Sequence, residues 1–290
     1  MRKWHLPALG LFLLAVLAAA ADPITFQKAV LISEGKRNQN LPSSGKALDL
    51  SPFLRSIPYG PELDMVYAVE PASKYRRTIL EGHGNCSNLI FGAAYHLDRS
   101  EIDYQIVHVL PTGFLEGRGH TLIRTRYSLN EEVKVGVVDV LAAGVPSSQG
   151  EGIDIAHMKG AVPDFSMLSL ALGKDDTSRY FGSYLDESHL GYLYADDVAR
   201  YFRFIEAVYV PILSERLEKL FYEGLALLVG VSPRIYVDSV SELFSGNRHV
   251  RYFYICILWI LRISAIVLPV SLVNEAYQYW TRSRLGPEAA

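Results

Sequence analysis

Cysteine is scarce in this chain. Its 290 residues include only Cys86 and Cys256, too few for the disulfide framework that holds many exported domains together. Cys256 lies in a long apolar segment, whereas Cys86 lies in a polar, glycine-rich one. We therefore predict that both are unpaired. An unpaired thiol in polar surroundings points to a reactive role for Cys86.

A large excess of charge of one sign is lacking as well, since 28 Lys and Arg residues stand against 31 Asp and Glu residues. The formal net charge is -3, and no block of Lys or Arg stands out, so we expect no nucleic-acid partner. The sequence also lacks an internal repeat, a phosphate-binding loop, a GxGxxG dinucleotide fingerprint and a spaced set of metal ligands. We accordingly expect no cofactor and no metal.

The N-terminus has the features of an export signal. Two basic residues open the chain, an apolar run covers residues 6–17, and four alanines follow at 18–21. These features predict a signal peptide over residues 1–21, cleaved before Asp22. The alternative is a retained membrane anchor. In both cases the body of the protein is expected outside the cytoplasm, in the periplasm or another extracytoplasmic compartment.

A second apolar segment lies near the C-terminus. Residues 252–273 are about as long as the ~20 residues that a spanning helix needs, and Arg262 at their centre costs roughly 2.5–3.5 kcal/mol on the insertion scale. Aromatic residues and then Arg282 and Arg284 follow, which suits a cytoplasmic exit, whereas Arg248 and Arg251 on the other flank argue weakly against that direction. We predict a transmembrane helix that anchors an exported domain, with a buried helix of a soluble domain as the alternative.

The rest of the chain divides into two predicted parts. The first, residues 22–194, has a tightly patterned core over 79–145 that reads as one helix and three strands. A loop-rich stretch follows this core, with a surface loop predicted over 146–152. The second part, 195–250, is predicted to be helical, with Pro211 splitting its main helix.

The segment around Cys86 is typical of a loop that leads into a helix. Asn85 is a favourable N-cap residue, and an apolar face at helical spacing follows it, formed by Leu89, Ile90, Ala93, Ala94 and Leu97. Cys86 is therefore expected in the first helical turn. There the helix dipole favours a thiolate, and backbone N–H groups can hold an oxyanion. The alternative is a small buried core cysteine.

A candidate base and its partner lie in the next two strands. His120 opens an alternating run, and a second alternating run ends near Asp139, which predicts a β-hairpin. A loop centred on Leu129 and Asn130 would place Arg126 opposite Val133 and His120 opposite Asp139, close enough for a hydrogen bond. Asp139 shares an otherwise apolar face and so needs a partner. If it points away, Asp98 or Glu116 would be the alternatives.

These three residues, in this order, resemble the transglutaminase-like superfamily. The resemblance covers residues 79–145 and rests on Gly84-Asn85-Cys86, Gly119-His120 and Asp139. It implies an α+β, papain-like cysteine-protease fold, in which the helix that begins at Cys86 packs on an antiparallel sheet. It also implies a thiol acyl-enzyme mechanism, with Cys86 as nucleophile, His120 as base and Asp139 as the residue that orients it. Thr121 departs from the aromatic residue that often follows the histidine in this family.

Three classes of function follow from the sequence. The first is an exported cysteine peptidase, amidase or acyltransferase that acts on a peptide, protein or cell-envelope amide and is held at the membrane through residues 252–273. The triad is the same whether water or an amine is the second substrate, so hydrolysis and transamidation both remain open. The second class is a non-catalytic binding or assembly module of the envelope, built on the same fold. The third is a membrane-bound assembly factor for an exported polymer, which the C-terminal apolar segment allows.

Overall fold

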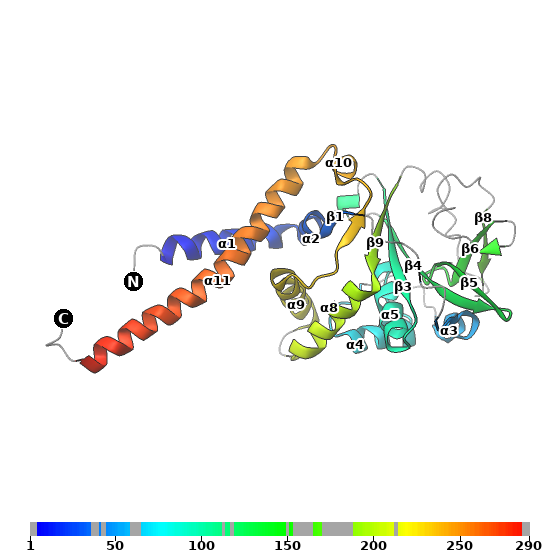
Figure 1. The fold of residues 1–290 in the computed structure, drawn as a ribbon, viewed down its shortest axis with the longest axis horizontal. Helices are drawn as coiled ribbons and strands as arrows, with labels where there is room; N and C mark the ends of the chain where they lie inside the picture. Colours follow the sequence, from blue (N-terminus) through cyan, green and yellow to red (C-terminus); the bar gives the residue numbers. More distant parts are fainter. Residues whose placement is uncertain are drawn as a thin grey trace. The chain divides into compact units, whose positions relative to one another are not determined.

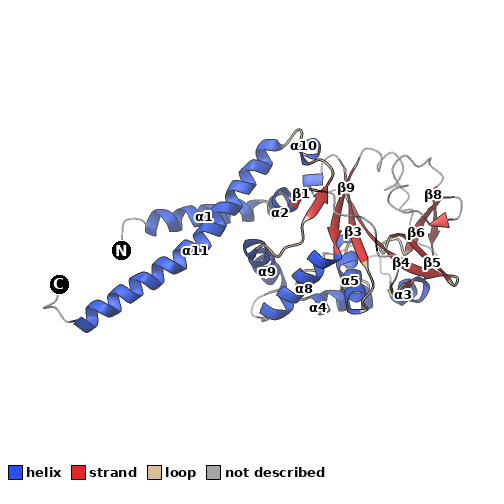
Figure 2. Ribbon diagram, in the orientation of Figure 1, coloured by secondary structure: helices blue, strands red, loops and turns tan. Residues whose placement is uncertain are grey.

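A computed structural model describes most of the chain, namely residues 5–35, 41, 45–58, 65–111, 114–116, 119–148, 151–152, 165–169, 188–211 and 214–285. The chain forms two compact units, residues 31–243 and the two ends 1–30 with 244–290. Helices and strands are mixed along the larger unit (Figure 1, Figure 2). The predicted α+β class is therefore confirmed.

The main sheet of the larger unit runs in the order β1-β10-β9-β3-β4-β2, and β5 pairs with β4 beside this path. Its strands are β1 (Ile32–Glu34), β2 (Leu48–Asp49), β3 (Tyr104–Leu110), β4 (His120–Leu129), β5 (Glu132–Val138), β9 (His189–Tyr194) and β10 (Ile235–Val237). The pairs among β9, β3, β4 and β5 are antiparallel, whereas β1–β10 and β2–β4 are parallel. The predicted core of one helix followed by three strands is confirmed as α5, β3, β4 and β5.

Helices cover the main sheet. They are α3 (Leu50–Ser56), α4 (Pro71–Tyr75), the π-helical turn η1 (Arg76–Leu80), α5 (Cys86–Arg99), the short 3₁₀ helix η2 (Phe114–Glu116), α8 (Ala195–Val208), α9 (Glu215–Val229) and α10 (Val240–Leu243). Both α5 and α8 pack on β3 and on each other. The predicted apolar face of α5 is buried in this core, with Ile90, Ala94 and Leu97 fully shielded from solvent. The helix predicted from residue 195 is split as expected, because Pro211 lies between α8 and α9.

A second, three-stranded sheet follows the hairpin. Its order is β7-β6-β8, with β6 at Gly144–Ser148, β7 at Glu151–Gly152 and β8 at Phe165–Ser169. The prediction of a surface loop over 146–152 was therefore wrong wherever the structure describes these residues. Pro, Ser and Gly gave this stretch the composition of a turn, but pairing with β8 makes Gly144–Ser148 a strand. Tertiary pairing decides strand formation more than local propensity does.

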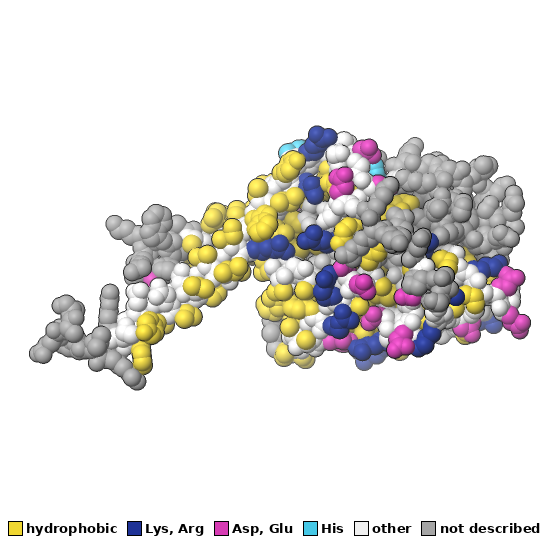
Figure 3. Space-filling view, viewed as in Figure 1, with side chains coloured by type: hydrophobic (Ala, Val, Ile, Leu, Met, Phe, Trp, Pro, Cys, Tyr) yellow, Lys and Arg dark blue, Asp and Glu magenta, His cyan; other side chains and the backbone are white. Residues whose placement is uncertain are grey.

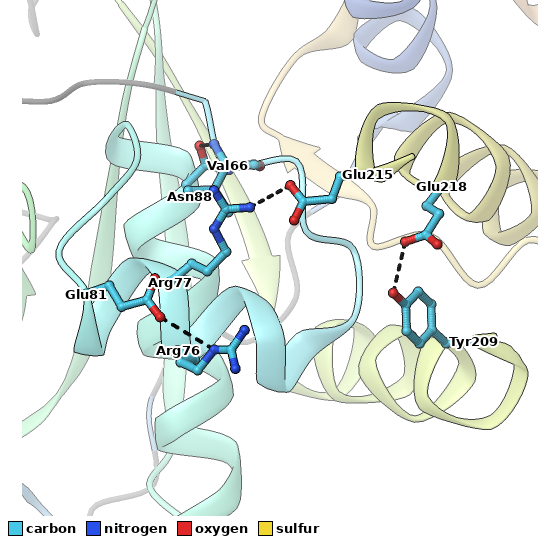
Figure 4. Close-up of polar contacts among 8 residues, drawn as sticks. All are labelled: Val66, Arg76, Arg77, Glu81, Asn88, Tyr209, Glu215 and Glu218. Atoms are coloured by element: carbon cyan, nitrogen blue, oxygen red, sulfur yellow. Dashed lines mark hydrogen bonds and ion pairs between the residues drawn. The ribbon is translucent and has the colours of Figure 1, made fainter. Parts of the chain in front are cut away.

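Polar contacts tie the helices together at their ends (Figure 4). Arg77 on η1 reaches Glu215 at the start of α9, with Nη1 and Oε2 2.5 Å apart. The Tyr209 hydroxyl after α8 donates to Glu218 Oε2 on α9 over 2.9 Å, and Glu218 is almost completely buried. The exposed pair is worth at most about 1 kcal/mol, whereas the buried tyrosine–carboxylate bond fixes α9 against the end of α8.

The smaller unit is built from three helices. They are α1 (His5–Ala21), α2 (Pro23–Leu31) and α11 (Arg248–Leu285). α1 and α11 contact each other, and the rings of Phe26 and Tyr254 meet with centroids 5.6 Å apart. By length and composition, α11 could cross a membrane over Arg248–Thr281, and α1 with α2 form a second such candidate with a bend of 99° between them.

Candidate active site

Cys86 stands at the first position of α5, as predicted. Asn85 is the N-cap residue, and its side-chain oxygen accepts a hydrogen bond from the Asn88 N–H over 3.1 Å. This bond satisfies one of the amides that have no acceptor inside the helix. The backbone N–H of Cys86 belongs to the same first turn, where amides have no acceptor inside the helix and can donate to a substrate oxygen. Both Cys86 and Cys256 are free, as the sequence indicates.

The loop before Cys86 is held in a shape that requires glycine. Gly84 has φ of +106°, and a Cβ atom there would lie 2.7 Å from the Asn88 Cβ and 3.2 Å from Val66 Cγ2. Asn88 is also bound to the Val66 backbone, because its Oδ1 accepts from the Val66 N–H and its Nδ2 donates to the Val66 carbonyl, each over 3.1 Å (Figure 4). These contacts fix the start of α5 from both sides.

The hairpin that carries the other two residues has a register different from the predicted one. Arg126 pairs with Val135 rather than with Val133, and the regular pairing ends at Ile123 and Val138. Asn130 and Glu131 form a two-residue turn with φ of 53° and 69°, which is the type I′ geometry favoured in hairpins. The prediction placed Leu129 in the turn. The slip amounts to two residues, so every side chain keeps its face of the sheet.

His120 and Asp139 nevertheless meet. His120 Nε2 and Asp139 Oδ2 are 2.7 Å apart, and the two side chains are 1% and 0% exposed. Asp139 lies just beyond the end of β5, where its backbone exchanges two hydrogen bonds with Gly144. Its Oδ1 also accepts from the Ala142 N–H over 3.1 Å. The turn that closes over residues 139–144 thus aims the carboxylate at His120, and the predicted contact is confirmed although its register was wrong.

Cys86 completes the arrangement from the other side. The His120 side chain and the Thr121 N–H both act on its thiol, and both lower the pKa of that thiol. Because Nε2 is taken by Asp139, Nδ1 is the ring nitrogen that can exchange a proton with the thiol. The structure therefore brings together Cys86, His120 and Asp139, the three residues selected from the sequence.

The electrostatics favour separated charges at this site. Burial raises the pKa of the Cys86 thiol. The His120 side chain and the Thr121 N–H lower this pKa by more than burial raises it, so the pKa lies below its usual value. Burial lowers the pKa of His120, whereas the charge and hydrogen bond of Asp139, together with Cys86, raise it to about 10. These shifts favour the thiolate–imidazolium pair over the neutral thiol–imidazole pair.

A group of hydrogen-bonded polar side chains next to the triad, namely Ser87, His108 and Thr121, was not predicted from the sequence. Thr121 Oγ1 lies 3.2 Å from Ser87 Oγ and 3.1 Å from His108 Nδ1. It connects the first turn of α5 to both β3 and β4, and its backbone N–H reaches Cys86. The alternating pattern showed only that Thr121 points away from the face of His120, so no local signal indicated this role.

The other histidines have different surroundings. The His96 ring is stacked on Phe53 and Tyr75, with centroids 5.3 Å and 5.7 Å away, and thus serves packing between helices. His83 has its N–H bonded to the Arg77 carbonyl. His157 lies outside the described residues. Within the described ranges, no group of three His, Cys, Asp or Glu side chains could hold a metal ion.

Comparisons with known proteins add no relative. No family model, no curated protein and no solved structure matches this chain.

Proposed function

We propose that this chain is an exported, thiol-dependent amide hydrolase or transamidase with a transglutaminase-like, papain-like core. The observation that carries this proposal is the buried His120–Asp139 pair, 2.7 Å apart, beside a thiol at a helix N-terminus. Burial of such a pair is costly unless it is well bonded, and the same imidazole lowers the pKa of the Cys86 thiol.

In the proposed reaction, the Cys86 thiolate attacks the carbonyl carbon of an amide and forms a C–S bond. The N–H of Cys86 donates to the oxygen that becomes negative. His120 then gives its proton to the leaving nitrogen as the C–N bond breaks, and a thioester remains on Cys86. Next, His120 takes a proton from water or from an amine, which attacks the thioester and regenerates the thiol. Asp139 keeps the imidazole oriented throughout.

The proposed substrate is a peptide, a protein or another amide of the cell envelope. No cofactor takes part in these steps, and the net charge of -3 gives no reason to expect nucleic acid as a partner. The proposed location is periplasmic or otherwise extracytoplasmic, with α11, and in particular residues 252–273, as the membrane anchor.

The test measures the reactivity of Cys86 without knowledge of the substrate. In a Cys256→Ser background, the rate of alkylation by iodoacetamide is followed against pH. We expect a midpoint below the ordinary thiol pKa, and His120→Ala should move it upward, because burial then acts without the imidazole. A midpoint that is the same with and without His120 would contradict the proposal.

A second arm tests turnover on a library of peptide and envelope amides. Cys86→Ala should abolish hydrolysis and transamidation while the protein stays folded, since the role of the thiol is chemical. His120→Ala should lower turnover by about 10²–10⁴-fold. If Cys86→Ala keeps full activity on a true substrate, the mechanism is wrong, and a non-catalytic module becomes the better description.

A further inference from the structure

The two apolar helices of the smaller unit, α1 and α11, pack against each other along one face of each helix. We call this line of contact the seam. On α1 the inward positions include Ala15, which is only 2% exposed, whereas its neighbours Leu14 and Leu17 are 65% and 64% exposed. On α11 the inward positions include Ser264, at 8% exposure, whereas Ile266 is 68% exposed. Ile257, Leu258 and Leu261 are buried on α11 beside Ser264. The inward faces thus hold both small and large residues, while large aliphatic residues also cover the outward faces.

The outward face of this pair differs from that of a helix pair in water. In water, large apolar side chains are buried in the seam and polar ones face out. In lipid, outward aliphatic side chains cost nothing, and small residues let the two helices approach closely. The large exposed side chains are numerous, namely Leu9, Leu11, Leu13, Leu14, Val16 and Leu17 on α1 and Ile263, Ile266, Val267, Val270, Leu272 and Val273 on α11. Figure 3 shows hydrophobic side chains along the visible part of α11.

The dimensions and the flanking charges also suit a bilayer. At 1.5 Å per residue, α1 with its 17 residues spans about 26 Å, and the apolar stretch 252–273 spans about 33 Å, close to the ~30 Å of a hydrocarbon core. The helices run antiparallel, so α1 begins at the end of the pair where α11 finishes (Figure 1). In the sequence, Arg2 and Lys3 precede α1, and two arginines lie near residue 285. These four basic residues lie in the sequence next to the same end of the pair, against Arg248 and Arg251 at the start of α11, and the positive-inside rule therefore favours that end as the cytoplasmic one.

The larger unit is connected suitably for such a pair. Its first strand, β1, pairs with its last strand, β10, at Ile32–Ile235 and Glu34–Val237. The chain therefore enters and leaves this unit through two neighbouring strands. A folded unit with adjacent ends can be inserted between two antiparallel helices without separating them.

We propose that α1 is not removed as a signal peptide but is retained, and that α1 and α11 form an antiparallel, two-helix anchor whose outward face is covered by lipid hydrocarbon. The sequence alone favours cleavage before Asp22. In the structure, α1 continues to Ala21, and Asp22 Oδ1 accepts from the Thr25 N–H over 3.1 Å at the start of α2. Removing α1 would uncover the seam of α11 that contains Leu258, Leu261 and Ser264. Arg262, in the middle of α11, lies with its guanidinium 5.8 Å from the Trp259 ring centroid, and the apolar residues around it outweigh its cost. This inference is independent of the chemistry of Cys86.

The first measurement is the intact mass of the full chain, expressed without a tag at its N-terminus and recovered from the membrane fraction of a bacterial host. We expect a chain that still contains residues 1–21. A mass that corresponds to a chain starting at Asp22 would overturn the proposal. So would recovery of the retained chain from the soluble fraction.

The second measurement tests the seam by disulfide cross-linking in those membranes. In a Cys86→Ala, Cys256→Ser background, Ala15→Cys is combined in turn with Leu258→Cys, Leu261→Cys and Ser264→Cys. At least one pair should close on mild oxidation. The matched control places the first cysteine at the neighbouring outward position, Leu14→Cys, and should close several-fold more slowly with all three partners. Equal rates for the two series, or no cross-link in either, would overturn the pairing.

Discussion

The residues of the candidate site depend on one another through charge. Asp139 is buried and bonded at both carboxylate oxygens, to His120 and to the Ala142 N–H. Because its charge raises the pKa of His120, it determines the pH up to which the imidazolium persists. The thiolate of Cys86 in turn requires that imidazolium.

Asp139→Asn should remove the negative charge of this side chain while keeping its size and shape. An asparagine oxygen can still accept from a backbone N–H, but the pKa of His120 should fall from about 10 toward or below its ordinary value. The folded pKa of wild-type His120 is raised, so its contribution to stability is fully present below about pH 6.5 and is lost as the pH rises through about 10. The imidazole titration measured by NMR should show this shift. An unchanged titration would mean that Asp139 does not set the charge of His120.

Part of the site could be predicted at the residue scale and part could not. The order of Cys86, His120 and Asp139 and the alternation of their strands were enough to select the three side chains. The polar group of Ser87, His108 and Thr121 depends on how α5 lies over β3 and β4, and no local pattern specifies that distance.

At the scale of elements, the turn of the β4–β5 hairpin sets the register. Periodicity predicted both strands and their faces, but it gave no sign that Leu129 pairs with Glu132. Glu131 carries a positive φ although glutamate has no preference for it. A turn residue of this kind could not be identified from the sequence, which explains the two-residue error.

Glu131→Gly should stabilise this hairpin. Asn-Gly is the favoured pair for a type I′ turn, and glycine removes the strain of the positive φ, so we expect a gain of about 0.5–1 kcal/mol in the free energy of unfolding. Urea denaturation measures it. The control, Glu132→Gly, changes a neighbouring strand residue and should lower stability. A loss at Glu131 would indicate a different turn.

Gly84→Ala should loosen the entry to α5. Its φ of +106° and the 2.7 Å approach to the Asn88 Cβ require the loop or the helix to shift, at a cost of about 1–3 kcal/mol, and Cys86 should alkylate more slowly because its alignment with His120 is disturbed. Gly224→Ala is the matched control. Nothing lies within 4 Å of a Cβ there, and the position is inside α9, so thermal unfolding should show a gain of up to about 1 kcal/mol. A neutral Gly84→Ala would contradict the close packing.

At the scale of the whole molecule, amino-acid composition predicted more of the domain organisation than hydrophobic periodicity did. The apolar ends were evident from the sequence, and both fall in the smaller unit. The three-residue strands β1 and β10 were not predicted, since they are too short for a pattern and their partners are far apart in the sequence. The second sheet was not predicted, because its strands resemble turns in composition.

Residues 31–243 should fold without the two ends. They form one compact unit with the core and the complete candidate site. We expect this fragment to be soluble and monomeric, with the thiol reactivity of the full chain, whereas the full chain should need detergent. Gel filtration with light scattering measures both. If the full chain is monodisperse without detergent, α11 is not a membrane anchor.

The β1–β10 pairing also imposes an order of events in time. The residues of the candidate site lie between positions 86 and 139, and its elements follow one another along the chain, so their contacts can form while synthesis continues. Ile32 can pair with Ile235 only after residue 235 has been synthesised, and until then this part of the sheet is incomplete. Such distant pairing is slow, because a long loop has to be ordered first. During synthesis, therefore, the thiol centre is expected to assemble early, while the strand edge of β9 stays open to other chains until the last fifth of the protein emerges.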